Sequence, residues 1–106
     1  MRIDFKCSGG YANIRLTYHA NTDELPQEVA NEILGLVESS RIFDLQQSEV
    51  EPTSKGPPDV FFYRLSLYEG TMRKSLYFND VTAPATLHPL LALLQELAWE
   101  QIRKGK

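Results

Sequence analysis

The sequence predicts an α+β fold, a four-stranded, mainly antiparallel sheet with two helices on one face, in the order ββαββα. Stretches with an apolar residue at every second position, typical of half-buried strands, occur in two pairs. Each pair is followed by a segment whose apolar residues recur at helical spacing. The 106 residues suit a single domain, residues 1–106, which is long enough to bury a core without disulfides.

The first two strands are predicted at residues 2–7 and 12–19, where apolar and polar residues alternate. Between them, Ser8-Gly9-Gly10 breaks the first strand, because adjacent glycines favour a turn with unusual backbone angles. We therefore expect these strands to pair as a hairpin.

The strongest pattern is a second hairpin at residues 60–78, with a two-residue turn at Glu69-Gly70. Gly70 is free to adopt the positive φ that such turns require. The residues expected to face the core are Phe61, Tyr63, Leu65, Leu67, Leu76 and Phe78. On the opposite face, among polar residues, we expect Phe62, Tyr68 and Tyr77.

The first helix is predicted to start near Leu25-Pro26 and to end at Ser39-Ser40, with a stripe of Val29, Ile33, Leu36 and Val37. Within it, Gly35 weakens the helix, and close packing on the sheet would explain the glycine. Ile42, Phe43 and Leu45 would form a short tail under the core, followed by an irregular stretch over residues 46–59.

The second helix is predicted from about Thr86 to Arg103. Its buried stripe would contain Leu87, Leu90, Leu91, Leu94, Leu97, Ala98 and Ile102. Leu93 and Trp99 lie off this stripe and would form either a second contact patch or a lid over the edge of the sheet.

Composition excludes several classes of function. A net charge of −3 and a pI near 5.3 argue against a nucleic acid or an anionic membrane as partner. The single cysteine allows no internal disulfide, which fits a reducing compartment. No signal peptide and no membrane-spanning stretch is recognisable, so we expect a cytoplasmic protein.

No residue pattern predicts catalysis, a metal or a cofactor. Cys7 continues the inward side of the first strand and is expected to be a buried structural thiol. His19 and His88 have neither a catalytic motif nor metal-ligand spacing around them. Ser8-Gly9-Gly10 lacks the lysine and the following helix of a phosphate loop. Three carboxylates lie near the start of the first helix, and we expect them to be solvated side chains without a catalytic role: Asp23, Glu24 and Glu28.

A binding module is therefore favoured over an enzyme. A sheet with helices on only one side leaves its other face open, and aromatic residues there mark a contact surface or stabilise the hairpin by pairing across strands. A non-enzymatic interaction domain, which binds another protein or a second copy of itself, would use this alternative partner face: Phe62, Tyr68 and Tyr77.

Several motifs along the chain are characteristic of one family. The first strand ends in the pattern x-S-G-G-x-A at residues 7–12, and Leu25-Pro26 leads into a helix. Ile42-Phe43-Asp44-Leu45 follows that helix. Pro58-Asp59 precedes Phe62-Tyr63, and Pro89, Leu90, Leu91 and Leu94 come late in the chain. In these features the sequence resembles the emfourin-like proteins, small bacterial inhibitors of thermolysin-type zinc metalloproteases related to the protein inhibitor of protealysin.

The resemblance implies a cytoplasmic protein that binds one protease molecule and occludes its substrate cleft, without a metal or cofactor of its own. The turn Ser8, Gly9 and Gly10 would then be the contact, because a glycine backbone enters a narrow cleft where a Cβ atom would clash. Asp23 and Glu24, or the loop 46–59, would add further contacts.

Overall fold

The computed structural model describes residues 1–9, 14–52 and 60–104. Its strands are β1 (Arg2–Gly9), β2 (Ile14–Asn21), β3 (Phe61–Glu69) and β4 (Met72–Asn79). The α-helices are α1 (Gln27–Ser40), α2 (Gln47–Val50) and α3 (His88–Lys104). Three single turns of 3-10 helix join them: η1 (Thr22–Glu24), η2 (Ile42–Asp44) and η3 (Ala85–Leu87).

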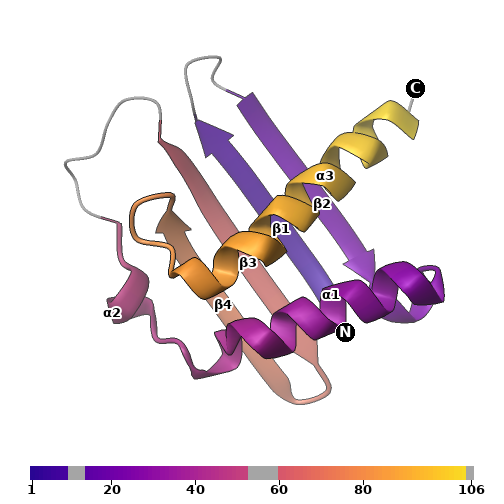
Figure 1. Ribbon diagram of the computed structural model, residues 1–106, viewed down its shortest axis with the longest axis horizontal. Helices are drawn as coiled ribbons and strands as arrows, with labels where there is room; N and C mark the ends of the chain where they lie inside the picture. The colour runs from indigo at the N-terminus through magenta and orange to yellow at the C-terminus, as the bar shows by residue number, and fades with distance from the viewer. Residues whose placement is uncertain (10–13, 53–59, 105–106) are drawn as a thin grey trace.

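The four strands form one antiparallel sheet in the order β2-β1-β3-β4. The two hairpins meet through the central pair, β1 and β3, which are far apart in the sequence. Both long helices, α1 and α3, cross the same face of the sheet (Figure 1). This arrangement confirms the predicted fold class, the number of strands and the order ββαββα.

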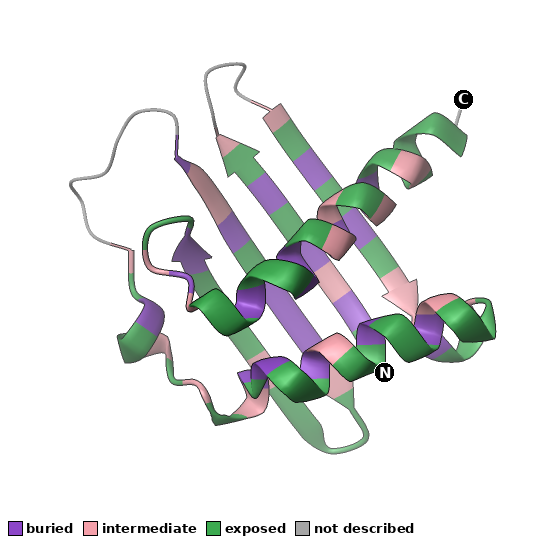
Figure 2. Cartoon of the chain, in the orientation of Figure 1, coloured by how far each residue is buried: buried purple, intermediate pink, exposed green. Residues whose placement is uncertain are grey.

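The core fills the space between the sheet and the helices. Along β1 and β2, buried residues alternate with exposed or partly exposed ones (Figure 2), as expected where helices cover only one face of a sheet. In β3 and β4 two buried polar residues, Ser66 and Asn79, interrupt this alternation. The fully buried large side chains are Ile3, Phe5, Ile33, Ile42, Val50, Leu65, Leu67, Leu76, Phe78, Leu87, Leu90 and Leu94. We call the uncovered side of the sheet the open face.

The β3–β4 hairpin differs from its prediction at two points. Glu69 pairs with Met72, so the turn consists of Gly70 and Thr71, one residue later than expected. Gly70 adopts φ +58°, which suits the first central position of a hairpin turn. Phe61 packs against the core but remains partly exposed, because it is the first residue of its strand.

Strand β1 is longer than predicted. Ser8-Gly9 does not break it, because Ser8 pairs with Arg15 and Phe62 while Gly9 pairs with Ile14 and Phe61. Pairing with strands on both sides keeps these two residues within β1, although Gly9 has a positive φ. The remaining part of the predicted turn, residues 10–13, lies outside the described residues.

Helix α1 ends at Ser40, as predicted, and Arg41 caps it with a positive φ of 54°. The expected reason for Gly35 is wrong: this residue is exposed, and no atom lies within 4 Å of where its Cβ would be. As predicted, η2 and the residue after it pack under the core through Ile42, Phe43 and Leu45.

Helix α3 buries most of its predicted stripe, but Leu97 is only half-buried and Ile102 is 40% exposed. The prediction for Ile102 is wrong because the last turns of α3 project beyond the strands (Figure 1), where no sheet lies beneath them. Leu93 packs partly against the core, whereas Trp99 is 44% exposed.

The irregular stretch predicted at residues 46–59 contains a helical turn, α2, that the sequence pattern did not reveal. Its Val50 is fully buried. The side-chain amide of Gln47 bonds to the backbone of Tyr77 in β4, accepting from its N–H (2.9 Å) and donating to its carbonyl oxygen (2.7 Å). Residues 53–59 lie outside the described part of the chain.

Candidate functional site

The described part of the predicted contact turn lies at the end of β1. Gly9 adopts φ +118°, and a Cβ at this position would lie 2.6 Å from the backbone oxygen of Val60. Both observations exclude a side chain, so the fold itself requires a glycine here. Ser8 is exposed and lies on the open face. Gly10, the third predicted contact, lies outside the described residues.

A cluster of hydrogen bonds centred on Asp80 fixes the strand next to Gly9. Asp80 Oδ2 accepts from the Phe61 N–H (3.1 Å), and Asp80 Oδ1 accepts from the Tyr63 hydroxyl (2.5 Å). The Asp80 N–H donates to the Phe61 carbonyl oxygen (3.1 Å), and Gln95 Nε2 donates to the Tyr63 hydroxyl (3.0 Å). We call these four hydrogen bonds the Asp80 clasp. They hold the start of β3, and hence Val60, against the end of β1.

The Asp80 clasp was not found from the sequence, because no pattern in the sequence singled out Asp80. The available signal was Asn79-Asp80 directly after an apolar strand, a pair of residues that favours a turn by bonding to the backbone. Asn79 does so, since its Oδ1 accepts from the N–H groups of Val81 and Thr82 at 2.9 Å each.

Cys7 is buried among core residues, as its place on the inward side of β1 predicted. Burial, with a smaller contribution from the Asp80 carboxylate, raises the pKa of this thiol to about 11. Burial and the hydrogen bond to Asp80 also raise the pKa of Tyr63. Cys7 is therefore protonated at neutral pH, whereas a nucleophilic cysteine needs a lowered pKa.

The predicted contacts Asp23 and Glu24 are exposed on η1 at the far end of the β1–β2 ladder. Gly9 pairs with Ile14 at one end, and Arg2 pairs with Asn21 at the other. Seven residue steps separate the two ends, roughly 23 Å. The structure therefore does not bring Asp23 and Glu24 together with Ser8 and Gly9.

The three aromatic residues predicted for the alternative partner face do lie on the open face, where two of them stack. The rings of Phe62 and Tyr77 have centroids 6.1 Å apart and an interplanar angle of 15°. The Arg64 guanidinium lies 5.4 Å from the Tyr77 ring centroid, and that of Arg2 lies 5.8 Å from the Tyr68 ring centroid. The open face thus combines tyrosine and arginine, which are frequent among energetically important interface residues.

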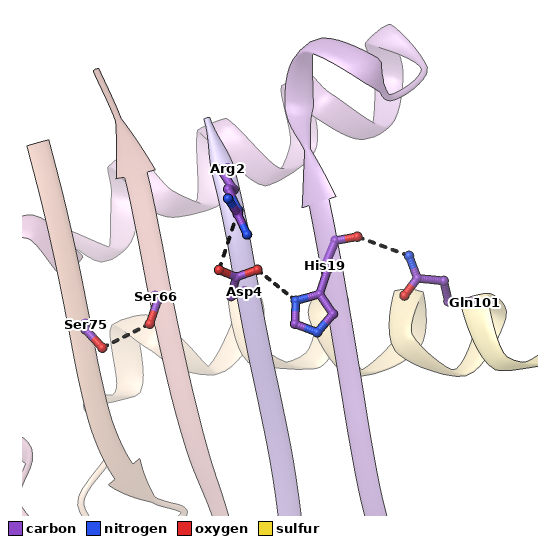
Figure 3. A network of polar contacts seen from close by, with 6 residues as sticks. All are labelled: Arg2, Asp4, His19, Ser66, Ser75 and Gln101. Carbon is purple, nitrogen blue, oxygen red and sulfur yellow. Dashed lines mark hydrogen bonds and ion pairs between the residues drawn. The ribbon is translucent and has the colours of Figure 1, made fainter. Parts of the chain in front are cut away.

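Sequence reasoning did not single out the basic residues of the open face. The pairing register places five of them there, all exposed: Arg2, Lys6, Arg15, Arg64 and Arg73. The one carboxylate among them is already paired (Figure 3), since Asp4 Oδ1 lies 2.7 Å from His19 Nδ1 and Asp4 Oδ2 lies 3.6 Å from Arg2 Nε.

The described residues were also compared with what a metal site and a membrane-spanning helix require. Among residues 1–9, 14–52 and 60–104, no three His, Cys, Asp or Glu side chains gather closely enough to hold a metal ion. Within the same ranges, no helix is long and apolar enough to cross a membrane.

Comparison with known protein families gives a match that covers most of the chain. The family model described as Emfourin matches residues 5–95 of this chain. The matched region extends from β1 into α3 and includes Ser8, Gly9 and most of the open face, but not Arg2 and Asp4 at the start of β1. No curated protein and no solved structure gives a significant match.

Proposed function

This chain belongs to the Emfourin family, and from this premise we propose that it is a protein inhibitor which binds and occludes the active-site cleft of a thermolysin-type zinc metalloprotease. It would act as a single domain in the bacterial cytoplasm, with no catalytic role of its own. The observation that carries the proposal is the family match over residues 5–95, which agrees with the motifs recognised along the sequence.

The proposed contact is the turn that begins at Ser8 and Gly9 and continues to Gly10. Its described part is firmly held, because β1 is paired on both sides and the Asp80 clasp fixes the neighbouring strand. A contact segment that is rigid before binding loses little conformational entropy when it enters a cleft. This rigidity supports an inhibitor that binds without rearranging.

Asp23 and Glu24 are not part of the contact formed by the turn. They lie at the other end of the sheet from Gly9, so they would contact the protease only if its surface extended beyond the cleft along the whole sheet. We therefore treat them as secondary contacts.

The test is inhibition of a purified thermolysin-type metalloprotease, measured by hydrolysis of a small peptide substrate while the inhibitor concentration is increased. We expect activity to fall to zero near one inhibitor per enzyme, with the inhibitor remaining intact on a gel. If several proteases of this type retain activity or digest the protein, the inhibitor function is wrong.

The contact itself is tested by Gly10→Trp. We expect this variant to fold but to lose inhibition, because an indole ring would fill the space that the turn needs inside the cleft. Gly35→Trp is the matched control, since it places the same ring on an exposed position of α1 with open space around it. Equal inhibition by both variants would show that the turn is not the contact.

A further inference from the structure

The open face is strongly cationic although the chain as a whole is acidic. Within the four described strands, this face holds five of the chain's eleven Lys and Arg residues and a single one of its fourteen Asp and Glu residues, Asp4. The face therefore carries a formal charge of +4, and since the net charge is −3, the rest of the chain carries −7. Such separation of charge creates a directional field around a small protein.

Part of this charge opposes folding. Lys6 and Arg64 lie directly opposite each other on the central strands β1 and β3, and like charges in such positions destabilise a sheet. A sequence selected for stability alone would place opposite charges there. The arrangement therefore indicates a role in binding.

We propose that the open face docks onto an acidic surface of a protein partner. The proposal deepens the proposed function and rests on it: the partner is the protease, and the acidic surface lies beside its cleft. The exposed Ser8 connects the two contacts, because it belongs to the proposed turn and also lies on the open face between Arg15 and Phe62.

The centre of the open face is hollowed to receive acidic side chains. A shallow depression of about 270 Å³ is lined by Arg2, Asp4, Lys6, His19, Arg64 and Ser66. Two of its shorter side chains, Asp4 and Ser66, lie opposite each other on β1 and β3, and the Ser66 hydroxyl bonds to that of Ser75 on β4 at 2.9 Å (Figure 3). Asp4 is held by His19 and Arg2, and among the described residues no carboxylate pairs with Lys6 or with Arg64, whose guanidinium lies over the Tyr77 ring. The N–H groups of both side chains can therefore bind a carboxylate from the partner.

The geometry favours a protein over a nucleic acid as the anionic partner. Single-stranded nucleic acids bind open sheets by stacking bases on exposed aromatic faces. Here the Tyr77 ring is stacked against Phe62 and covered by Arg64, and the Tyr68 ring has Arg2 over it. The −7 charge outside the face would also repel a polyanion that extended beyond it.

Size indicates that the open face and the turn act together. Four strands of about eight residues offer an area on the order of 500 Å². A stable protein interface buries about 800 Å² on each partner. The face alone falls short of this area, so the partner must bury further surface beside it, which the proposed contact at Ser8 and Gly9 would supply.

The test measures the inhibition constant and the association rate with a thermolysin-type metalloprotease at 25 mM and 250 mM NaCl. We expect Lys6→Glu and Arg64→Glu to weaken inhibition by about tenfold or more, mainly through slower association, and salt to reduce the difference. The matched controls Lys104→Glu and Arg103→Glu make the same charge changes on exposed positions of α3. They should change inhibition by no more than about twofold.

Stability separates weakened binding from damage to the fold. Lys6→Glu would face Arg64 as an opposite charge, so this variant should unfold at a higher urea concentration than the parent while it inhibits less. If the parent inhibits and the β1 and β3 variants behave like the α3 controls, the docking proposal is wrong while the inhibitor function stands.

A second arm needs no protease, so it still tests the open face if the inhibitor function fails. Fluorescent polyglutamate and polyuridine are titrated with the parent, Lys6→Glu and Lys104→Glu at 25 mM NaCl. We expect binding to polyglutamate that Lys6→Glu reduces at least fivefold relative to Lys104→Glu. Tighter binding to polyuridine, or no difference between the two variants, would overturn the proposal.

Discussion

At the scale of single residues, two glycines that look equivalent in the sequence have opposite consequences. Gly9 lies in a left-handed conformation against the backbone oxygen of Val60, whereas Gly35 lies on the exposed side of α1 with open space around it. The fold needs the first glycine and gains nothing from the second.

We therefore predict opposite changes in stability from the same substitution. Gly9→Ala should lower the free energy of unfolding by about 1–3 kcal/mol, because the added Cβ meets backbone and the φ angle is strained. Gly35→Ala should raise it by about 0.5–1 kcal/mol through helix propensity. Urea denaturation of both variants checks the prediction, and a stabilising Gly9→Ala would contradict the close approach of Val60.

The thiol of Cys7 predicts a pH dependence. In the unfolded chain it loses its proton near pH 9, whereas the folded protein keeps it up to about pH 11. The folded state thus binds more protons in this window, so stability should fall as pH rises from 9 to 11. Urea midpoints of the parent and Cys7→Ala at pH 8 and pH 9.5 test this: the parent should lose more stability, and equal losses would contradict the burial of the thiol.

At the scale of elements, residues between α1 and β3 cover the outer edge of β4, and they come from the predicted tail and from the stretch predicted to be irregular. Gln47 pairs its side-chain amide with both backbone groups of Tyr77, and Lys74 Nζ donates to the carbonyl oxygen of Leu45 at 2.7 Å. The amide thereby makes the two backbone hydrogen bonds that a neighbouring strand would make. An uncovered edge strand invites pairing with other chains, so this contact protects the sheet.

We predict that Gln47→Ala lowers the free energy of unfolding by about 1–2 kcal/mol, because two hydrogen bonds to the backbone are lost. It should also increase association at high protein concentration, since the backbone groups of Tyr77 become free. Gln46→Ala, at the exposed preceding residue, is the control for urea denaturation and light scattering. If Gln47→Ala resembles it in both measurements, the edge is not protected in this way.

The elements that sequence reasoning predicted are those coded by local patterns. Alternation over residues 60–78 defined the second hairpin, and the stripe from Val29 to Val37 defined α1. Helix α2 was missed because it depends on Gln47 reaching a strand thirty residues away. The turn was placed one residue early because alternation alone does not set the register at Gly70.

The candidate site shows the same limit. Ser8-Gly9-Gly10 was visible as a short motif, but the Asp80 clasp was not, because it joins residues that meet only after β3 and β4 have paired. The basic residues of the open face were also hidden. They come from all four strands, and they become neighbours only through the central pairing of β1 with β3, which the local pattern did not specify.

At the scale of the whole molecule, the separation of charge bears on the alternative function. A self-associating domain that used Phe62, Tyr68 and Tyr77 would form a symmetric dimer in which the open face meets its own copy. Five cationic side chains would then oppose five others across the interface. Aromatic stacking would have to overcome that repulsion, which is strongest at low salt.

We predict that the protein sediments as a 12.1 kDa monomer at both 25 mM and 500 mM NaCl, because the repulsion prevents dimers at low salt and the face alone is too small for a stable interface at high salt. Sedimentation velocity over a hundredfold range of concentration measures this. Arg64→Gln, which lowers the charge of the face, tests the cause: any association should increase with this variant and with salt. A dimer that forms at 25 mM NaCl and is lost with Tyr77→Ser would favour self-association over inhibition of a protease.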